Sequence, residues 1–355
     1  MPEKTLRLIV GGKNYTGWQS ASVHRTIEAV AGTFSLGLTD IIRGSDLPLI
    51  KRNDRAKIEI QPTPKAKVIK LLDGFVDKVK IQVDKKVQFS IIGRDRTADI
   101  VDSSIIKKSE FKGLKFEQAV QAIVDPFKIK VVLQAGLDTG DVLKTITNDP
   151  GTKIYELIAK YAQLKQLLCY TLPDGRLIIS RVATETTTAA FIEGGKEGNI
   201  LRYSHTTDGT KMFSEYTVKG SHAVTIQETE AQAAHVEGQA KDDRINRLRQ
   251  LLIIPDTAQN KTTAVDRAIW EMQTRRAQGE SYSVTIKGWQ PILNVIAFLK
   301  LPSLQFEGNM LISAYTIRFD QSGKTTTFKF VHPDSFRALP TSTITKDKKD
   351  TNLNQ

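Results

Sequence analysis

Side chains of alternating apolar and polar character dominate the first hundred residues of this 355-residue chain. The segment Thr33 to Thr39 shows the pattern most clearly, with Phe34, Leu36 and Leu38 on one face. Successive side chains of a strand point to opposite faces of its sheet, so a period of two predicts half-buried β-strands. Further strands are expected at 5–10, 15–25, 56–60, 71–83 and 86–93, with a hairpin turn at 84–86. Short strands of this kind, separated by turn residues, favour a small closed β-barrel or sandwich.

The hydrophobic period changes after Asp102. Phe116, Val120, Ile123 and Val124 recur at helical spacing, and Pro126 ends that helix. A strand is expected at 129–134, a second helix at 152–165, and a hairpin of strands 167–171 and 177–181 around a Pro-Asp-Gly turn. This order predicts a small α/β domain over 106–183.

The remainder of the chain is again rich in strand patterns. A linker is expected at 184–198, strands at 200–206, 215–220, 281–287, 311–320 and 325–330, and a polar exposed loop at 226–262. A helix is expected at 263–278, with Val265, Ala268, Ile269 and Met272 facing inward. The predicted fold is therefore mixed and β-rich, with two antiparallel β-barrels and the α/β domain between them. Its domains are 1–105, 106–183, 184–337 with the polar loop and helix at 226–279, and a polar C-terminal tail at 338–355.

The charge of the chain is positive but mild. Lysine and arginine total 51 against 39 acidic residues, a net charge of +12. Residues 1–100 hold 18 basic and 11 acidic side chains and so carry more than half of the excess. A nucleic-acid-binding tail carries far denser charge. No segment has the roughly 20 apolar residues of a membrane helix, and the N-terminus lacks the apolar core of a signal peptide.

Cysteine and histidine usage argues against a disulfide framework, a metal site or a reactive thiol. The single cysteine, Cys169, sits in an apolar run and is expected to be buried. The five histidines lack metal-ligand spacing and are expected in surface or turn positions. These are His24, His205, His222, His235 and His332. We expect no metal and no cofactor, and a chain that folds in a reducing cytoplasm.

Two clusters of charged residues are candidate functional sites. Asp73 and Asp77 share a strand face by alternation, but a turn or solvated role is favoured over a glycosidase-like pair. The segment 93–99 places Arg94, Asp95, Arg96 and Asp99 within six residues at the end of a strand. We interpret this corner as a subunit contact in which Asp95 and Asp99 hold Arg94 or Arg96, the alternative being an ion-paired corner with no partner.

The motifs around this corner carry a family resemblance. The chain has an Asp-Gly-x-Val strand at 73–76, followed at 93–102 by the strand end Gly-Arg-Asp-x-Thr-x-Asp-Ile-Val-Asp. Together they resemble the baseplate hub proteins of contractile phage tails, most closely those of phage Mu and related prophages. Segments 131–136, 157–159, 172–178, 323–330 and 332–336 agree with the same family, so the resemblance spans about 5–337. The polar stretch 226–262 has no counterpart that we identify.

The resemblance implies a structural role in the virion. Such hubs are trimers in which every subunit contributes two similar barrels, so that six barrels match the hexameric tail tube and the threefold surface matches the trimeric central spike. Implied partners are further copies of the chain, the spike, the tail tube protein or tube initiator, and baseplate wedge proteins. Assembly would take place in the host cytoplasm, without a membrane or sequence-specific nucleic acid.

Two other functions are weighed against this one. A single-strand nucleic-acid-binding barrel would interleave basic and aromatic residues on one strand face, whereas the aromatics of the first hundred residues lie mostly at core-like positions. A tail-associated cell-wall hydrolase needs a catalytic pair, and none stands out. The sequence therefore predicts a structural protein rather than an enzyme.

Overall fold

The computed structural model describes residues 6–41, 49–61, 63, 65–84, 87–107, 109–140, 142–165, 167–220, 236–254, 261–321 and 323–336. The chain divides into two compact units. We call Met1–Thr207 with Glu280–Pro333 the sheet unit, and Asp208–Gly279 with Asp334–Gln355 the insert unit. The insert unit interrupts the sheet unit in sequence between two strands of one sheet.

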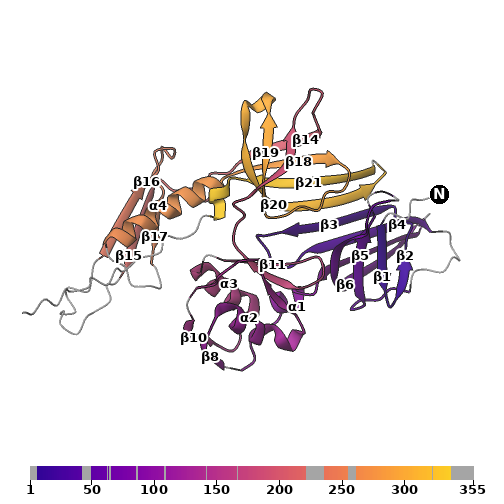
Figure 1. Ribbon diagram of the computed structural model, residues 1–355, viewed down its shortest axis with the longest axis horizontal. Coiled ribbons are helices and arrows are strands. Elements are labelled where there is room, and N and C mark those ends of the chain that lie inside the picture. The colour runs from indigo at the N-terminus through magenta and orange to yellow at the C-terminus, as the bar shows by residue number, and fades with distance from the viewer. Residues whose placement is uncertain are drawn as a thin grey trace, which may run out of the picture. The chain divides into compact units, whose positions relative to one another are not determined.

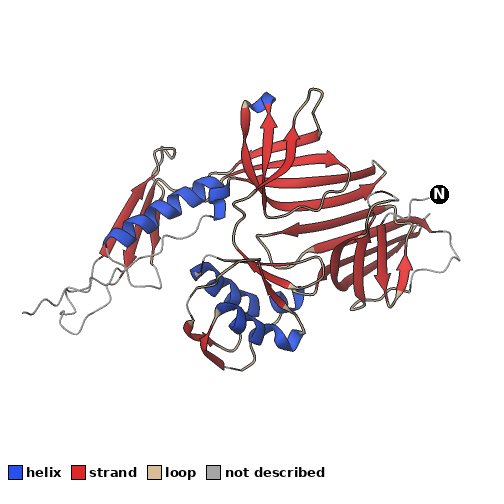
Figure 2. Cartoon of the chain, viewed as in Figure 1, coloured by secondary structure: helices blue, strands red, loops and turns tan. Residues whose placement is uncertain are grey.

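The sheet unit is built on one large, mostly antiparallel sheet (Figures 1 and 2). Its first seven strands are β1 (Leu6–Val10), β2 (Lys13–Tyr15), β3 (Ser20–Thr26), β4 (Thr33–Ile41), β5 (Arg55–Ile60), β6 (Ile69–Val83) and β7 (Val87–Asp95). Its last six are β13 (Thr186–Ile192), β14 (Ile200–Thr207), β18 (Glu280–Lys287), β19 (Val295–Leu301), β20 (Phe306–Asp320) and β21 (Gly323–Val331). The alternating burial predicted at Phe34, Leu36 and Leu38 is confirmed, since the first two are buried and Leu38 packs against the same core.

The two groups of strands repeat one arrangement. In space the first group runs β1-β5-β6-β7-β4-β3, and the second runs β13-β19-β20-β21-β18-β14. The members correspond one to one in chain order once the short β2 is set aside. Both long strands, β6 and β20, have 15 residues, and both hairpin partners, β7 and β21, have nine. One connection differs, because β1 pairs antiparallel with β5 whereas β13 pairs parallel with β19. The chain thus contains two copies of one six-strand layout.

The expectation of two β-barrels is not confirmed, and the two repeats pair with each other. β3 of the first repeat pairs antiparallel with β20 of the second, with Val23 opposite Ile317. This pairing makes the two repeats one continuous sheet of 13 strands. No closed barrel occurs among the strands that the structure describes. Sequence patterning predicts each strand but not this pairing, because β20 pairs with a strand almost 300 residues away.

The α/β region forms a second core within the sheet unit (Figure 2). It comprises α1 (Ala98–Asp102), β8 (Ser109–Leu114), α2 (Phe116–Val124), a 3-10 turn (Asp125–Phe127), β9 (Val131–Leu133), β10 (Leu143–Asn148), α3 (Ile154–Leu164), β11 (Leu168–Thr171) and β12 (Leu177–Ser180). The predicted hairpin is confirmed as β11–β12. Phe116, Val120 and Val124 of α2 are buried against Leu157 and Ile158 of α3, as the helical spacing predicts.

The insert unit is a three-stranded sheet covered by one helix. Its strands are β15 (Glu215–Gly220), β16 (Val236–Lys241) and β17 (Gln250–Ile253), and its helix is α4 (Lys261–Gln278). Ala264 and Ala268 of α4 pack on Tyr216 and Val218 of β15. Gly238 in β16 is needed there, because a Cβ on it would lie 2.2 Å from the Ala264 carbonyl carbon.

Three expectations for the second half are wrong. The segment 184–198 is not a simple linker, since it contains β13 with the fully buried Phe191. The segment 226–262 is not one exposed loop, since β16 and β17 lie within it. The largely polar sequence of β16 and the length of β17, only four residues, obscured these strands, whose inward side chains pack against the core of the insert unit. Ile269 points outward from α4, because the close helix–sheet contact selects the small Ala264 and Ala268 instead. The tail at 338–355 lies outside the described residues.

Candidate functional site at the β7 corner

The corner begins where β6 and β7 approach unusually closely. A Cβ on Gly74 would lie 1.9 Å from the carbonyl oxygen of Arg94, and one on Gly93 would lie 2.1 Å from that of Phe75. Real side chains never approach backbone atoms that closely, so only glycine fits at either position. The glycines of both family-like motifs therefore have a packing role, which brings the end of β7 against β6.

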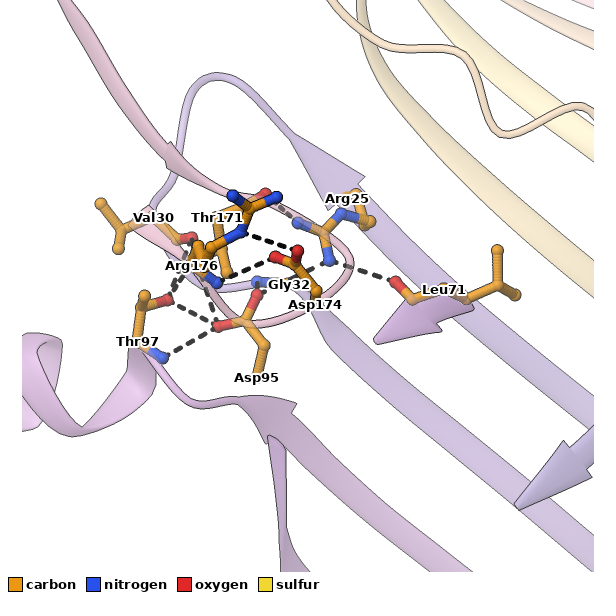
Figure 3. Close-up of polar contacts among 9 residues, drawn as sticks. All are labelled: Arg25, Val30, Gly32, Leu71, Asp95, Thr97, Thr171, Asp174 and Arg176. Atoms are coloured by element: carbon orange, nitrogen blue, oxygen red, sulfur yellow. Dashed lines mark hydrogen bonds and ion pairs between the residues drawn. The ribbon is translucent and has the colours of Figure 1, made fainter. Parts of the chain in front are cut away.

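Asp95, the last residue of β7, is buried and accepts several hydrogen bonds (Figure 3). Its carboxylate accepts from the backbone N–H of Gly32 at 2.7 Å and from the hydroxyl of Thr97 at 2.6 Å. The backbone N–H of Thr97 donates to it as well, at 3.3 Å. Burial raises the pKa of Asp95, while the nearby Arg25 guanidinium and these hydrogen bonds act in the opposite direction. Asp95 is thus enclosed by its own chain and has no surface to offer a partner.

Arg25 links the sheet to the α/β region beside Asp95. Its guanidinium is buried, with Nη1 3.9 Å from the Asp95 carboxylate. It donates one hydrogen bond to the Leu71 carbonyl of β6 at 3.1 Å and another to the Thr171 carbonyl of β11. A buried arginine that donates to two separate segments in this way holds them close to each other.

Two threonine hydroxyls complete the buried network (Figure 3). The hydroxyl oxygens of Thr97 and Thr171 lie within hydrogen-bond distance of each other, and the carbonyl oxygen of Val30 lies within hydrogen-bond distance of both, at 3.3 and 2.5 Å. Each hydroxyl has one proton to donate, so the two side chains share the Asp95 carboxylate and the Val30 carbonyl as acceptors. Val30 lies in the loop between β3 and β4, and its side chain packs in the core of the α/β region. The network therefore joins three segments: the β3–β4 loop, the β7 end and the β11 end. Sequence reasoning missed Arg25 and Thr171, which are 146 residues apart.

Arg94 takes part in a separate, half-exposed cluster. Its guanidinium binds Asp77 of β6 at 2.8 Å and Asp102 of α1 at 2.7 Å. Hydrogen bonds from Arg94 lower the pKa of Asp102, and both carboxylates raise that of Arg94. The expected pairing of Arg94 with Asp95 or Asp99 is therefore wrong. Asp77, from the neighbouring strand, and Asp102, one helical turn beyond Asp99, supply the carboxylates instead.

The other two corner residues differ in their surroundings. The Arg96 guanidinium donates to the Lys128 carbonyl at 2.8 Å, and its backbone N–H donates to the Asp73 carbonyl. Asp99 lies in the first turn of α1, with most of its side chain exposed. Partial loss of solvation and the nearby charge of Asp102 raise its pKa. The structure thus divides the four residues among a buried network, a surface ion cluster and a tertiary contact. Their role as a subunit contact stays a prediction for Arg94, Arg96 and Asp99.

The candidate catalytic groups are engaged in structural contacts. Asp73 binds Arg55 through both oxygens, at 3.0 and 2.8 Å, while Asp77 binds Arg94. Cys169 is buried as expected, and burial raises its pKa to about 12. In the described part of the chain no group of three potential metal ligands occurs, and no helix is long and apolar enough to cross a membrane. His222 and His235 lie outside the described residues.

Comparisons with known proteins divide the chain at this corner. Residues 5–95 match the family profile described as Mu phage baseplate assembly protein GpP-like, N-terminal, and residues 97–181 match baseplate hub protein gp44-like, second domain. The chain is 28% identical over 292 residues to the baseplate hub protein gp44 of Escherichia phage Mu, covering 80% of this chain and 74% of the relative.

Solved structures share the fold over nearly the whole chain. A 43 kDa tail protein of prophage MuSo2 from Shewanella oneidensis superposes with a TM-score of 0.80 at 24% identity, covering 95% of this chain and all of that one. A tail protein from Neisseria meningitidis MC58 gives 0.74 at 18% identity, covering 93% and 98%. The fold is thus that of a phage tail protein. Two profiles of Mu-like baseplate proteins match residues 5–95 and 97–181, and the resemblance to baseplate hub proteins that the two motifs predict is confirmed.

Proposed function

We propose that this protein is the structural hub of a contractile tail baseplate, a homotrimer that joins the hexameric tail tube to the trimeric central spike. The observation that carries the proposal is the repeated six-strand layout within one chain. Three chains supply six copies of that layout for a sixfold tube, while the assembly keeps threefold symmetry for a spike. The similarity to the baseplate hub protein of phage Mu supports this.

The proposal includes the location and the remaining partners. The protein would be a virion component at the base of the tail, assembled in the host cytoplasm, contacting the tube protein or a tube initiator and the baseplate wedge. It would act without a cofactor and without catalysis. The ion pairs of Asp73 with Arg55 and of Asp77 with Arg94 support a structural rather than hydrolytic use of these carboxylates.

Light scattering with size exclusion tests the oligomeric state, first on the chain alone and then with its spike protein added. A trimer in either sample, ring-shaped in negative-stain images, is the expected result. A chain that remains monomeric in both samples contradicts the adaptor function. Degradation of peptidoglycan by the purified protein, abolished by Asp73→Asn, would contradict the non-catalytic role.

A further inference from the structure

The β3–β20 pairing joins the two repeats, and the strand edges equivalent to those it uses are unpaired elsewhere in the described sheet. Within the chain, β3 of the first repeat pairs with the second half of β20. The strand equivalent to β20 is β6, and the strand equivalent to β3 is β14. β14 is the terminal strand of the sheet, and β5 covers only the Ile69–Phe75 half of β6. No described strand pairs with the outer edge of β14 or with that of Lys78–Val83.

The register of the two long hairpins fixes the equivalence in β6. Pairing of β6 with β7 is interrupted by one extra residue, Asp77, and pairing of β20 with β21 by one extra residue, Ser313. Such bulges shift the register by one residue and so mark a position in each strand. Counting four residues beyond each bulge makes Ile81 the equivalent of Ile317.

A walk across neighbouring strands fixes the equivalence in β14. Val23 of β3 lies opposite Phe34, which lies opposite Gly93, the β7 residue paired just before the bulge. In the second repeat, His205 of β14 lies opposite Tyr282, which lies opposite Phe330 at the same place relative to its bulge. His205 is therefore the equivalent of Val23.

Burial distinguishes the used seam from the unused one. Ile317, whose edge is covered by β3, is 1% exposed, whereas its equivalent Ile81 is 50% exposed and Val83 is 58% exposed. β3 buries every second side chain, whereas no side chain of β14 is fully buried. An uncovered strand edge with apolar side chains beside it is a template for pairing with another chain.

We propose that β14 of one copy pairs antiparallel with Lys78–Val83 of β6 in the next copy, repeating between chains the β3–β20 seam found within one chain. The intrachain register, with Val23 opposite Ile317, transfers directly. It places His205 opposite Ile81, Tyr203 opposite Val83, and Thr207 opposite Val79 of the neighbour. Continued by one residue, it sets Arg202 opposite Asp84, and such cross-strand pairs of opposite charge are favourable.

The pairing is head to tail, since it uses different strands on the two copies. A head-to-tail contact closes into a ring only if the rotation that relates one copy to the next is a whole fraction of 360°. The number of copies, three, rests on the proposed function, but the strand pairing itself rests only on the repeat. In such a ring each chain supplies one internal seam and one external seam of the same geometry, and neither edge stays exposed.

Paired cysteines test the register directly, because the only natural cysteine is buried. Two matched variants are made: Ile81→Cys with His205→Cys, and Lys80→Cys with Thr206→Cys. Opposed pairs in an antiparallel ladder alternate between a hydrogen-bonded and a non-hydrogen-bonded site, and only the second kind brings the two Cα atoms close enough for an unstrained disulfide. One of the two variants therefore has the right spacing. The control, Ile81→Cys with Tyr203→Cys, is displaced by two residues and should leave the sulfurs too far apart. Mild oxidation of the full chain is expected to give a covalent trimer from a matched variant and little crosslinking from the control.

Light scattering on the same samples separates the two claims. A trimer that neither matched variant crosslinks overturns the strand pairing and leaves the hub function standing. A chain that stays monomeric and gives no crosslinks, both alone and with the spike protein added, overturns both. Equal crosslinking by matched and control variants overturns the register. As an independent measurement, Ile81→Lys with Val83→Lys should shift the trimer to monomer while circular dichroism stays unchanged, because both side chains are exposed in one chain. A double lysine variant that remains fully trimeric contradicts the proposal.

Discussion

Arg276 of α4 binds both carboxylate oxygens of Asp242, at 2.7 and 2.6 Å, and the Asp242 side chain has no exposed surface. Asp242 lies just after β16, so this pair ties the helix of the insert unit to its sheet. Burial pushes the pKa of Asp242 upward, but the hydrogen bonds from Arg276 and from the Arg244 backbone outweigh it and lower the pKa from 3.8. A carboxyl group with a lowered pKa contributes stability above its unfolded-state value and loses it as the pH falls through the folded-state value.

Asp242→Asn should therefore destabilise the insert unit near neutral pH and remove part of its acid sensitivity. We expect faster hydrogen exchange in β15, β16 and α4 at pH 7, corresponding to a loss of about 1–3 kcal/mol for a charged hydrogen bond. The difference from the parent should shrink as the pH falls below 4. Asp243→Asn is the matched control, because that neighbouring carboxylate is exposed. Equal effects of both variants at pH 7 would contradict the structural role of the pair.

The buried Arg25–Asp95 contact predicts a large asymmetry between single and double variants. Arg25→Met leaves a buried carboxylate without its cation, which typically costs about 3–5 kcal/mol. Adding Asp95→Asn should recover much of that loss, since no buried charge remains. The free energy of unfolding in urea is measured for the parent, for Arg25→Met and for the double variant. Arg176→Met is the control, because its partner Asp174 is half-exposed and such pairs contribute about 0–1 kcal/mol. A double variant less stable than Arg25→Met would show that the pair is not coupled as described.

Gly74→Ala should be among the most damaging small substitutions in the chain. The added methyl group would meet the Arg94 carbonyl at 1.9 Å, so β6 and β7 must separate. Overpacking of this kind costs about 1–3 kcal/mol or more. Gly308→Ala in β20 offers a matched control, because its nearest neighbour would lie 3.5 Å away. Thermal unfolding should show a clear loss for the first variant only. Similar melting temperatures for the two would argue against the close strand approach.

Replacing Arg94 and Arg96 together by alanine tests the corner as a subunit contact. We expect weaker assembly with an unchanged β-sheet signal in circular dichroism, since the Arg94 ion pairs are half-exposed and contribute modestly to folding. The single Arg94→Ala variant should retain more of the assembly than the double variant. If the double variant assembles as well as the parent at physiological salt, the corner serves only the fold of one chain.

Sequence patterning predicts most of the strands and helices, because burial on one face imposes a period that is visible locally. It predicts α2 with its observed bounds and the β11–β12 hairpin. It misses the long-range pairings, such as that of β3 with β20, because the hydrophobic pattern of a strand does not specify which distant strand pairs with it. It fails most clearly in β16, whose sequence is largely polar, and in β17, which has only four residues.

The corner shows the same division between local and distant information. The density of charge at 94–99 draws attention to the corner, but it does not reveal that Asp95 is buried and that Arg94 is half-exposed. That separation depends on Arg25 and Thr171, which come from other elements. Asp77 also comes from a neighbouring strand. Partners of this kind become visible only when the chain is folded.

The two ends of the insert unit have a consequence for how such chains can change. Thr207 and Glu280 lie opposite each other in the last pair of the β14–β18 ladder, so the segment Asp208–Gly279 of the insert unit begins and ends at adjacent backbone positions. In the first repeat the equivalent β3–β4 connection is only the short loop 27–32. A hairpin that accepts either six residues or an entire folded module is a natural point of exchange. Lineages could replace the module, and engineers could graft a cargo domain there, while the surrounding sheet keeps its register.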